Sequence, residues 1–244
     1  GIGGARNAGQ KRAKGKYLFF LDADDRILPG KLSLQVPALA QSAADAVFSD
    51  YQVKKEDGIE KVDIGHRTRV FEDARHQFLA WSQQISSFLF CKEALDAVGG
   101  HRRMPAEDKD LYFRLLFSGF QFVYTPGVVF QYQPQPNSYT SDELAYLNRT
   151  RKRNFHLLAY NYLKKQGELK DSYKKIISRK LLLEAQQWAR YGEWGMAKDR
   201  YKNARNINKE SPYKLWYYKV LYRLFGFLIL EYMLYKIRTI RHSV

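Results

Sequence analysis

The sequence predicts an α/β domain over residues 1–140, with a mixed sheet flanked by helices, followed by a helical extension over residues 141–244. Three observations support this prediction. An apolar run from Tyr17 to Leu21 ends in three carboxylates, as expected of a strand that opens into a ligand crevice. Strand-like and helix-like segments alternate up to residue 140. From Ser141 the strand signals end and long basic helices begin.

Charge is distributed unevenly along the chain, which has 244 residues and a net charge of +16. Residues 1–140 hold 18 lysines and arginines against 16 acids, whereas residues 141–244 hold 23 against 9. The surplus of +14 in the second part favours an anionic partner, either a membrane surface or a nucleic acid. The hydrophobic fraction of 45% is ample for a packed core, and the single cysteine excludes an internal disulfide.

The first element is a Gly-rich turn that leads into a short basic helix ending near Gly15. Its glycine spacing does not fit dinucleotide binding, because Arg6 stands where the third glycine belongs. Arg6 and Asn7 at the helix N-terminus either face an anion or form a solvated first turn. No signal peptide is visible and no strand precedes this helix, so we expect an N-terminally truncated fragment.

The run from Tyr17 to Leu21 is expected to be a strand buried on both faces, because five consecutive apolar residues leave no polar side for solvent. Asp22 and Asp24 follow it, and on an extended backbone two residues at this spacing point the same way. Two such carboxylates suit Mg²⁺ or Mn²⁺, especially a cation that also binds phosphate oxygens. The alternative is an acidic turn after a strand.

The elements that follow are predicted from periodicity and from turn residues. Pro29-Gly30 precedes a helix over 31–41 that Pro37 should bend. Glu107, Asp108 and Asp110 open a helix that Gly119 closes, and acids in a first turn can serve only the helix dipole. The other expected elements are strands at 45–53, 59–64 and 87–91, helices at 71–81 and 92–98, two short strands around Pro126-Gly127 within 121–132, and a loop at 133–140.

The extension is predicted to form helices over about 141–165, 171–190, 194–206 and 212–240. In the last of these, Arg223 and Glu231 interrupt the apolar stretch, which is therefore too short to span a bilayer. Aromatic residues and leucines mixed with lysines and arginines suit a helix in the membrane interface. The alternative is an amphipathic helix packed against its own domain.

Three pieces stand in one order along the chain: Ala5-Arg6-Asn7, then Leu21-Asp22-Ala23-Asp24-Asp25, then Glu107-Asp108 with Arg114 following. Together they resemble the family 2 glycosyltransferases, which have the GT-A fold, and the resemblance covers about residues 1–140. It implies a nucleotide-diphosphate sugar donor, a UDP-sugar first among them, a divalent cation, Mg²⁺ or Mn²⁺, and inversion at the anomeric carbon. The acceptor would be a saccharide or a lipid-linked saccharide.

The resemblance also implies roles for individual residues. Asp24 and Asp22 would hold the metal, Arg6, Asp22 and Asp24 would contact the nucleotide sugar, and Asp108 would be the catalytic base, with Glu107 the less favoured candidate. A family histidine is expected on a late loop, where this chain has Gln135. The Gln-x-x-Arg-Trp motif of processive synthases is absent, so we expect addition of a single sugar.

The resemblance and the basic extension together predict an enzyme of surface polysaccharide or glycolipid synthesis, bound peripherally at the cytoplasmic face of the cell membrane. Two other hypotheses remain: a catalytically degenerate scaffold, and a basic protein that binds membranes or nucleic acid. Nucleic acid is the less favoured partner, because no recognised nucleic-acid motif is present. Acceptor choice is expected to depend on residues 83–87, 101–106 and 133–140.

Overall fold

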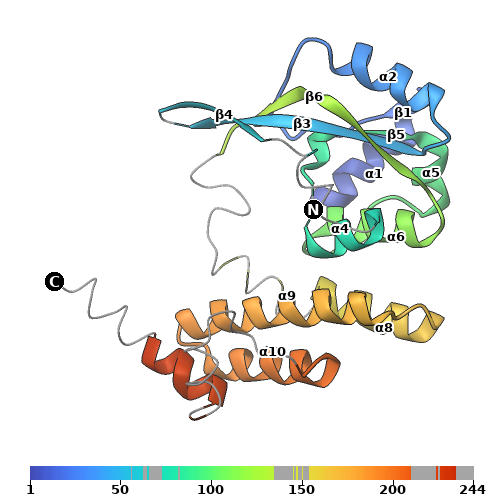
Figure 1. Ribbon diagram of the computed structural model, residues 1–244. Coiled ribbons are helices and arrows are strands. Elements are labelled where there is room, and N and C mark those ends of the chain that lie inside the picture. Colours follow the sequence, from blue (N-terminus) through green and yellow to red (C-terminus); the bar gives the residue numbers. More distant parts are fainter. Residues whose placement is uncertain are drawn as a thin grey trace. The chain divides into compact units, whose positions relative to one another are not determined.

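The computed structural model describes residues 1–55, 57–62, 65, 73–81, 83–134, 145, 147, 150, 154–209, 224 and 226–234. The chain forms two compact units, residues 1–146 and residues 147–244. In Figure 1 the first unit has a sheet with helices on both of its faces, and the second unit consists of helices. The α/β fold with a mixed sheet and the helical character of the C-terminal region are therefore confirmed.

One mixed sheet runs through the first unit, in the order β1-β5-β3-β6-β2, with β4 paired to β3. Strands β3 and β6 are parallel, and the other pairs are antiparallel. The strands are β1 (Tyr17–Leu18), β2 (Arg26–Ile27), β3 (Ala46–Lys55), β4 (Gly58–Val62), β5 (Phe88–Cys91) and β6 (Phe122–Tyr132).

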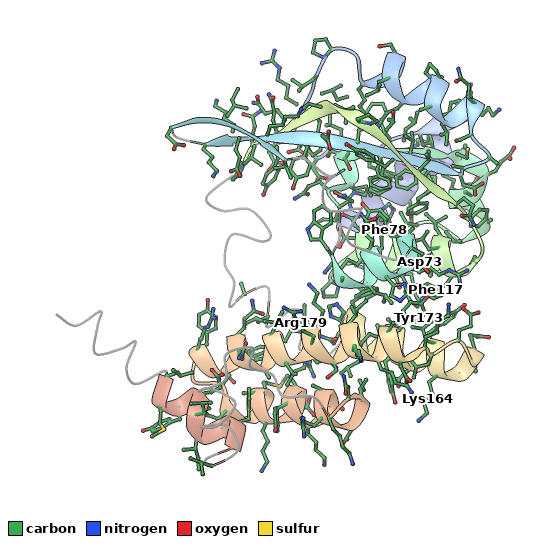
Figure 2. The ribbon with its side chains drawn as sticks, in the orientation of Figure 1. Asp73, Phe78, Phe117, Lys164, Tyr173 and Arg179 are labelled. Carbon is green, nitrogen blue, oxygen red and sulfur yellow. The ribbon has the colours of Figure 1, made fainter. Side chains whose placement is uncertain are left out.

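Helices cover both faces of this sheet. Successive side chains of β3 point to opposite faces, and apolar residues on each face pack against helices. Val47 packs with Leu89 and with Leu39 of α2 (Lys31–Gln41). On the other face, Phe78 of α4 (Ala74–Ala80) lies under the sheet, and its ring contacts those of Phe48 and of Tyr112 in α6 (Glu107–Phe117) (Figures 1 and 2). The same face carries α1 (Ile2–Arg12) and α5 (Lys92–Ala97) (Figure 1).

Three predictions about this unit are wrong in detail. The strand expected over 17–21 is β1, only two residues long, and Leu21 is 43% exposed. Strand β1 lies at the edge of the described sheet, where it pairs with β5, and both of its residues are only partly buried. The Gly-rich start is already helical, because α1 begins at Ile2.

The two strands expected around Pro126-Gly127 are one strand, β6. The pairing with β3 shifts register opposite Asp50, and this irregularity accommodates the proline and the glycine. Gly127 has φ +142° and its N–H donates to Asp50 Oδ2 at 3.3 Å, so the Asp50 side chain replaces part of the interrupted ladder. A side chain of the partner strand therefore keeps β6 continuous.

The second unit is a helical assembly built on α9 (Asp171–Arg190), which pairs extensively with α10 (Trp194–Ile207) and also contacts α8 (Phe155–Gln166). Ile177, Leu181, Ala185 and Trp188 of α9 are completely buried, and their spacing of three or four residues forms one apolar face. Among the described residues no helix is long and apolar enough to cross a membrane. Residues 224 and 226–234 are helical, and most of the helix expected over 212–240 lies outside the described residues.

Candidate functional site

Three carboxylates converge on one guanidinium group in the first unit. Arg6 Nη2 lies 2.7 Å from Asp22 Oδ1, and Arg6 Nη1 lies 2.9 Å from Glu107 Oε1 and 2.6 Å from Asp108 Oδ1. The Arg6 side chain is only 11% exposed. The structure therefore brings together four of the five site residues predicted from sequence, which come from α1, from the segment after β1 and from the start of α6.

Helix α1 is held at this place by close contact with the loop before α6. The Asn7 side chain accepts a hydrogen bond from His101 N and donates one to His101 O, both at 2.8 Å. Gly100 has φ +64°, and a Cβ atom there would lie 2.5 Å from Asn7 Oδ1. Two neighbouring residues of α1 therefore have different roles: Asn7 holds the loop at His101, and Arg6 binds the three carboxylates.

Helix α6 starts at the site with an unusual backbone. Its N-cap residue, Ala106, has φ 57° and ψ 42°, a left-handed conformation that is uncommon for a residue with a Cβ atom. Such a residue costs about 1–3 kcal/mol and persists only where its surroundings impose it. The strained cap sets the direction in which Glu107 and Asp108 leave the loop.

The carboxylate pair at the start of α6 is not symmetric. Burial, followed by the neighbouring charge of Asp108, raises the pKa of Glu107. The Glu107 side chain is 11% exposed, and that of Asp108 is 25% exposed. Arg6 contacts Asp108 through Oδ1, and within the described residues no hydrogen bond reaches Asp108 Oδ2. Asp108 Oδ2 is therefore the oxygen that can accept a proton from a bound molecule.

The charges around Arg6 do not cancel. One guanidinium faces the carboxyl groups of Asp22, Glu107 and Asp108, which leaves a formal deficit of two positive charges when all are ionised. Burial opposes the charge on Arg6, but Asp108 and Asp22 outweigh burial and raise the pKa of Arg6, so it stays protonated. A site with this balance attracts cations.

The turn after β1 carries Asp22, Asp24 and Asp25 and is closed by a hydrogen bond from Asp25 N to Asp22 O at 3.0 Å. Burial, opposed by a hydrogen bond from Ser86, raises the pKa of Asp25 to about 6. The Asp24 carboxylate makes no hydrogen bond or ion pair with any described residue. Asp24 is thus the carboxylate of this turn that is open to a ligand.

The donor set fits a divalent cation only in part. In the described part of the chain, no three side chains of His, Cys, Asp or Glu are grouped as metal ligands. Asp24 and the second oxygen of Asp22 supply hard oxygen donors of the kind that Mg²⁺ and Mn²⁺ take, and Mg²⁺ commonly completes its shell with water and substrate phosphate. The residues therefore fit a cation that arrives with a diphosphate. Gln135, considered as a further ligand, lies outside the described residues.

Two functional candidates, His101 and Ser86, lie in segments that were expected to influence acceptor choice, but neither residue was singled out from the sequence. His101 is buried, its ring lies edge-on to Phe20 at 4.8 Å, and its Nε2 is 3.3 Å from Asp108 Oδ1 without hydrogen-bond geometry. Ser86 contacts the acidic turn directly through its hydroxyl group. A lone histidine and a serine in a polar loop carry no spacing signal, so only the fold reveals them.

Arg114, which completes the sequence pattern, lies away from the carboxylates that meet Arg6. Its Nε donates to Asp110 Oδ2 at 2.7 Å, and its Nη2 donates to Gly100 O at 2.6 Å. It also donates to Val98 O, near the C-terminus of α5. Arg114 and Asp110 therefore support the loop that leads to α6.

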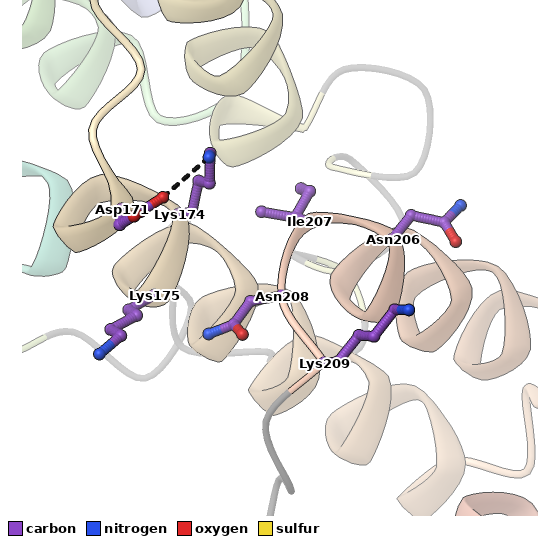
Figure 3. A pocket seen from close by; sticks show the side chains of 7 residues that line it. All are labelled: Asp171, Lys174, Lys175, Asn206, Ile207, Asn208 and Lys209. Atoms are coloured by element: carbon purple, nitrogen blue, oxygen red, sulfur yellow. Dashed lines mark hydrogen bonds and ion pairs between the residues drawn. The ribbon is translucent and has the colours of Figure 1, made fainter.

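The second unit has a separate pocket of about 460 Å³ between the first turn of α9 and the end of α10 (Figure 3). Lys174 and Lys175 line one side, and Lys209 lines the other. Lys174 pairs with Asp171 at 2.8 Å across exposed side chains. The pocket is basic on balance and open to solvent, which suits an anionic group.

Comparison with known proteins gives one family match. Residues 1–99 match the glycosyl transferase family 2. No curated protein matches the chain. Similar solved structures include TarS 1–349 of S. aureus in complex with UDP-GlcNAc, with 13% identity, a TM-score of 0.47 and coverage of 84% of this chain and 72% of that one. TarS 1–349 in complex with UDP has 15% identity, a TM-score of 0.46 and coverage of 84% and 71%.

Proposed function

We propose that this chain transfers one sugar, with inversion, from a nucleoside-diphosphate sugar to a hydroxyl group of a saccharide or lipid-linked acceptor. The match of residues 1–99 to the glycosyl transferase family 2 supports this proposal. Uridine diphosphate sugars are the first donors to test. The observation that carries the proposal is the convergence of Asp22, Glu107 and Asp108 on Arg6. It brings the donor-side turn next to the predicted base, although Asp22 and Asp108 lie 86 positions apart in the sequence.

In this proposal Asp108 is the catalytic base. The acceptor oxygen forms a bond to the anomeric carbon while the bond from that carbon to the phosphate oxygen breaks, and the electron pair leaves with the nucleoside diphosphate. Asp108 Oδ2 takes the proton of the acceptor hydroxyl. Arg6 holds Asp108 Oδ1 at 2.6 Å and fixes the direction of the second oxygen. The greater exposure of Asp108 favours it over Glu107.

The donor diphosphate would lie against the turn that carries Asp22 and Asp24. A bound Mg²⁺ or Mn²⁺ would neutralise charge on the leaving phosphate. Asp24, which is free of protein partners among the described residues, and Asp22 would hold it. The excess of negative charge around Arg6 favours a cation at this site. Arg6 would contact the donor at the expense of its pairing with Asp22, the most exposed of its three carboxylates.

The experiment that tests the donor side compares the protein with its Asp24→Asn variant. Binding of Mn²⁺ and uridine diphosphate is measured together by calorimetry, and nucleotide release is measured with a panel of uridine diphosphate sugars. We expect cation-dependent binding in the unchanged protein and at least tenfold weaker binding in Asp24→Asn. Asp57→Asn, which changes an exposed carboxylate in the turn between β3 and β4, is the matched control. Equal binding in all three proteins would contradict the proposed donor site.

We further propose that the helical unit attaches the enzyme to an anionic membrane surface, which would place it at the cytoplasmic face of the cell membrane and near lipid-linked acceptors in surface polysaccharide or glycolipid synthesis. The charge surplus of residues 141–244 supports this. On α8, Leu158 and Tyr162 are 45% and 40% exposed and lie one turn apart, beside Lys164 and Lys165. Apolar side chains beside lysines are typical of interfacial helices.

Co-sedimentation with vesicles tests this attachment. Vesicles that contain phosphatidylglycerol should retain the protein, and vesicles of phosphatidylcholine should not. Leu158→Ser together with Tyr162→Ser should weaken retention, whereas Ile59→Ser in β4, an exposed apolar residue of the first unit, should not. Retention on RNA or DNA but not on anionic vesicles would favour the nucleic-acid alternative.

A further inference from the structure

A buried polar network lies directly behind the acidic turn. Lys31, at the start of α2, is 1% exposed. Its Nζ atom donates to Gln35 Oε1 at 2.8 Å, to Ser86 O at 3.0 Å and to Phe88 O at 3.1 Å. A lysine ammonium has three N–H donors, and the network provides an acceptor for each of them.

Ser86 connects this network to the turn. Its hydroxyl group donates to Asp25 Oδ2 at 2.7 Å and lies 3.4 Å from Asp22 N, which donates to it. One hydroxyl group therefore contacts both ends of the turn from Asp22 to Asp25, with Asp24 between them. Ser86 is itself 1% exposed, and its carbonyl oxygen is fixed by Lys31.

Burial of a lysine is unfavourable, because the free energy of desolvating its ammonium group must be compensated by hydrogen bonds. An apolar residue would fill the same volume at lower cost. Gln35 adds further polar links, with Nε2 donating to Ser87 O at 2.7 Å and to Ser49 Oγ at 3.0 Å. One branch of the network reaches the Asp25 carboxylate through the Ser86 hydroxyl group, and this branch connects Lys31 to the acidic turn.

We infer that Ser86 is a positioning residue for the acidic turn, and that Lys31 fixes Ser86 so that Asp22 and Asp24 are pre-arranged for a cation bound to a diphosphate. The inference rests on the proposed function. It also changes the role expected for residues 83–87, from acceptor choice to donor-site geometry. Ser86 contacts the Asp25 carboxylate and the backbone N–H of Asp22, so it acts by holding the turn that carries Asp24.

Two adjacent serines give a matched test. Ser87 is as buried as Ser86, but its hydroxyl group donates to Gln84 O at 2.7 Å and does not contact the turn. Binding of Mn²⁺ with uridine diphosphate is measured by calorimetry for Ser86→Ala and Ser87→Ala. We expect about tenfold weaker binding for Ser86→Ala, because about one residue of the turn must then be ordered on binding, and a change below twofold for Ser87→Ala. The thermal midpoints of both variants show whether loss of stability explains the difference.

Kinetics provide a second readout. Ser86→Ala should raise the KM for the donor and leave the KM for the acceptor unchanged, and Ser86→Thr, which keeps a hydroxyl group, should restore the donor KM at least in part. Equal binding by Ser86→Ala and the unchanged protein, or an equal loss in both alanine variants, would overturn the inference. A rise in the acceptor KM alone would do the same. If Asp24→Asn also leaves Mn²⁺ binding intact, the proposed function fails, and not only the role of Ser86.

Discussion

Replacing Arg6 by methionine should destabilise the first unit strongly. The side chain is 11% exposed and pairs with Asp22, Glu107 and Asp108 at 2.6–2.9 Å. Removing one partner of a buried ion pair leaves an uncompensated charge and typically costs about 3–5 kcal/mol. Asp22 is 42% exposed and can be solvated, so Glu107 and Asp108 account for most of the loss. We expect a cost of about 3 kcal/mol at pH 7.5.

The loss of stability caused by Arg6→Met should be smaller at low pH. Burial raises the pKa of Glu107, so its carboxylate destabilises the folded state at neutral pH, and this penalty disappears as the pH falls through the folded pKa. Without the positive charge of Arg6, the Glu107 carboxylate becomes protonated at a higher pH. The difference between Arg6→Met and the unchanged protein should therefore be smaller at pH 5.0 than at pH 7.5.

Urea denaturation, monitored by hydrogen exchange in the peptide 107–117, measures the stability of the first unit separately from that of the helical unit. Arg102→Met is the matched control, because Arg102 is 64% exposed and lies 3.5 Å from Asp110, a contact worth at most about 1 kcal/mol. An Arg6→Met variant that is as stable as Arg102→Met, or that loses equal stability at both pH values, would refute the charge-balance reasoning.

Two further predictions concern the surroundings of the site. Burial lowers the pKa of Lys31 to about 7, below that of a lysine in the unfolded chain. Between pH 7 and 10 the unfolded chain therefore keeps a proton on Lys31 that the folded protein has lost, and the stability of the fold rises with pH in this range. The unfolding free energy of the unchanged protein minus that of Lys31→Met should increase by about 2 kcal/mol from pH 7 to pH 9. If this difference does not change with pH, burial is not the cause. Gly99→Ala and Gly100→Ala both place a Cβ atom at positive φ, but only that of Gly100 would meet Asn7. Thermal unfolding should show a larger loss for Gly100→Ala, and equal losses would mean that Asn7 moves aside freely.

Local sequence signals predicted the regular elements where propensity and packing agree. The helix over 31–41 is reproduced because Gly30 provides the left-handed residue before it and Val36 and Leu39 face the sheet. Propensity misled at Pro126-Gly127, where the Asp50 side chain repairs the ladder. It misled again at Tyr17–Leu21, since an apolar run does not reveal how many neighbours a strand will have.

The site was predicted as a set of residue types and not as an arrangement. The order of Arg6, Asp22 and Asp108 along the chain indicated the family, but their convergence depends on α1 packing against the loop at Gly100. Contacts between residues about 100 positions apart follow from tertiary packing, which spacing does not encode. The role of Ser86 shows the same limit, because its hydroxyl group matters only where the fold places it beside Asp25.

The most direct test of the account is the effect of Asp108→Asn on donor binding and on turnover, measured in the same preparation. The account predicts that Asp108→Asn binds uridine diphosphate with Mn²⁺ within a few-fold of the unchanged protein. It also predicts that transfer to acceptor falls by at least a hundredfold, the lower end of the contribution of a general base. Transfer at the unchanged rate would contradict the assignment of Asp108 as the base.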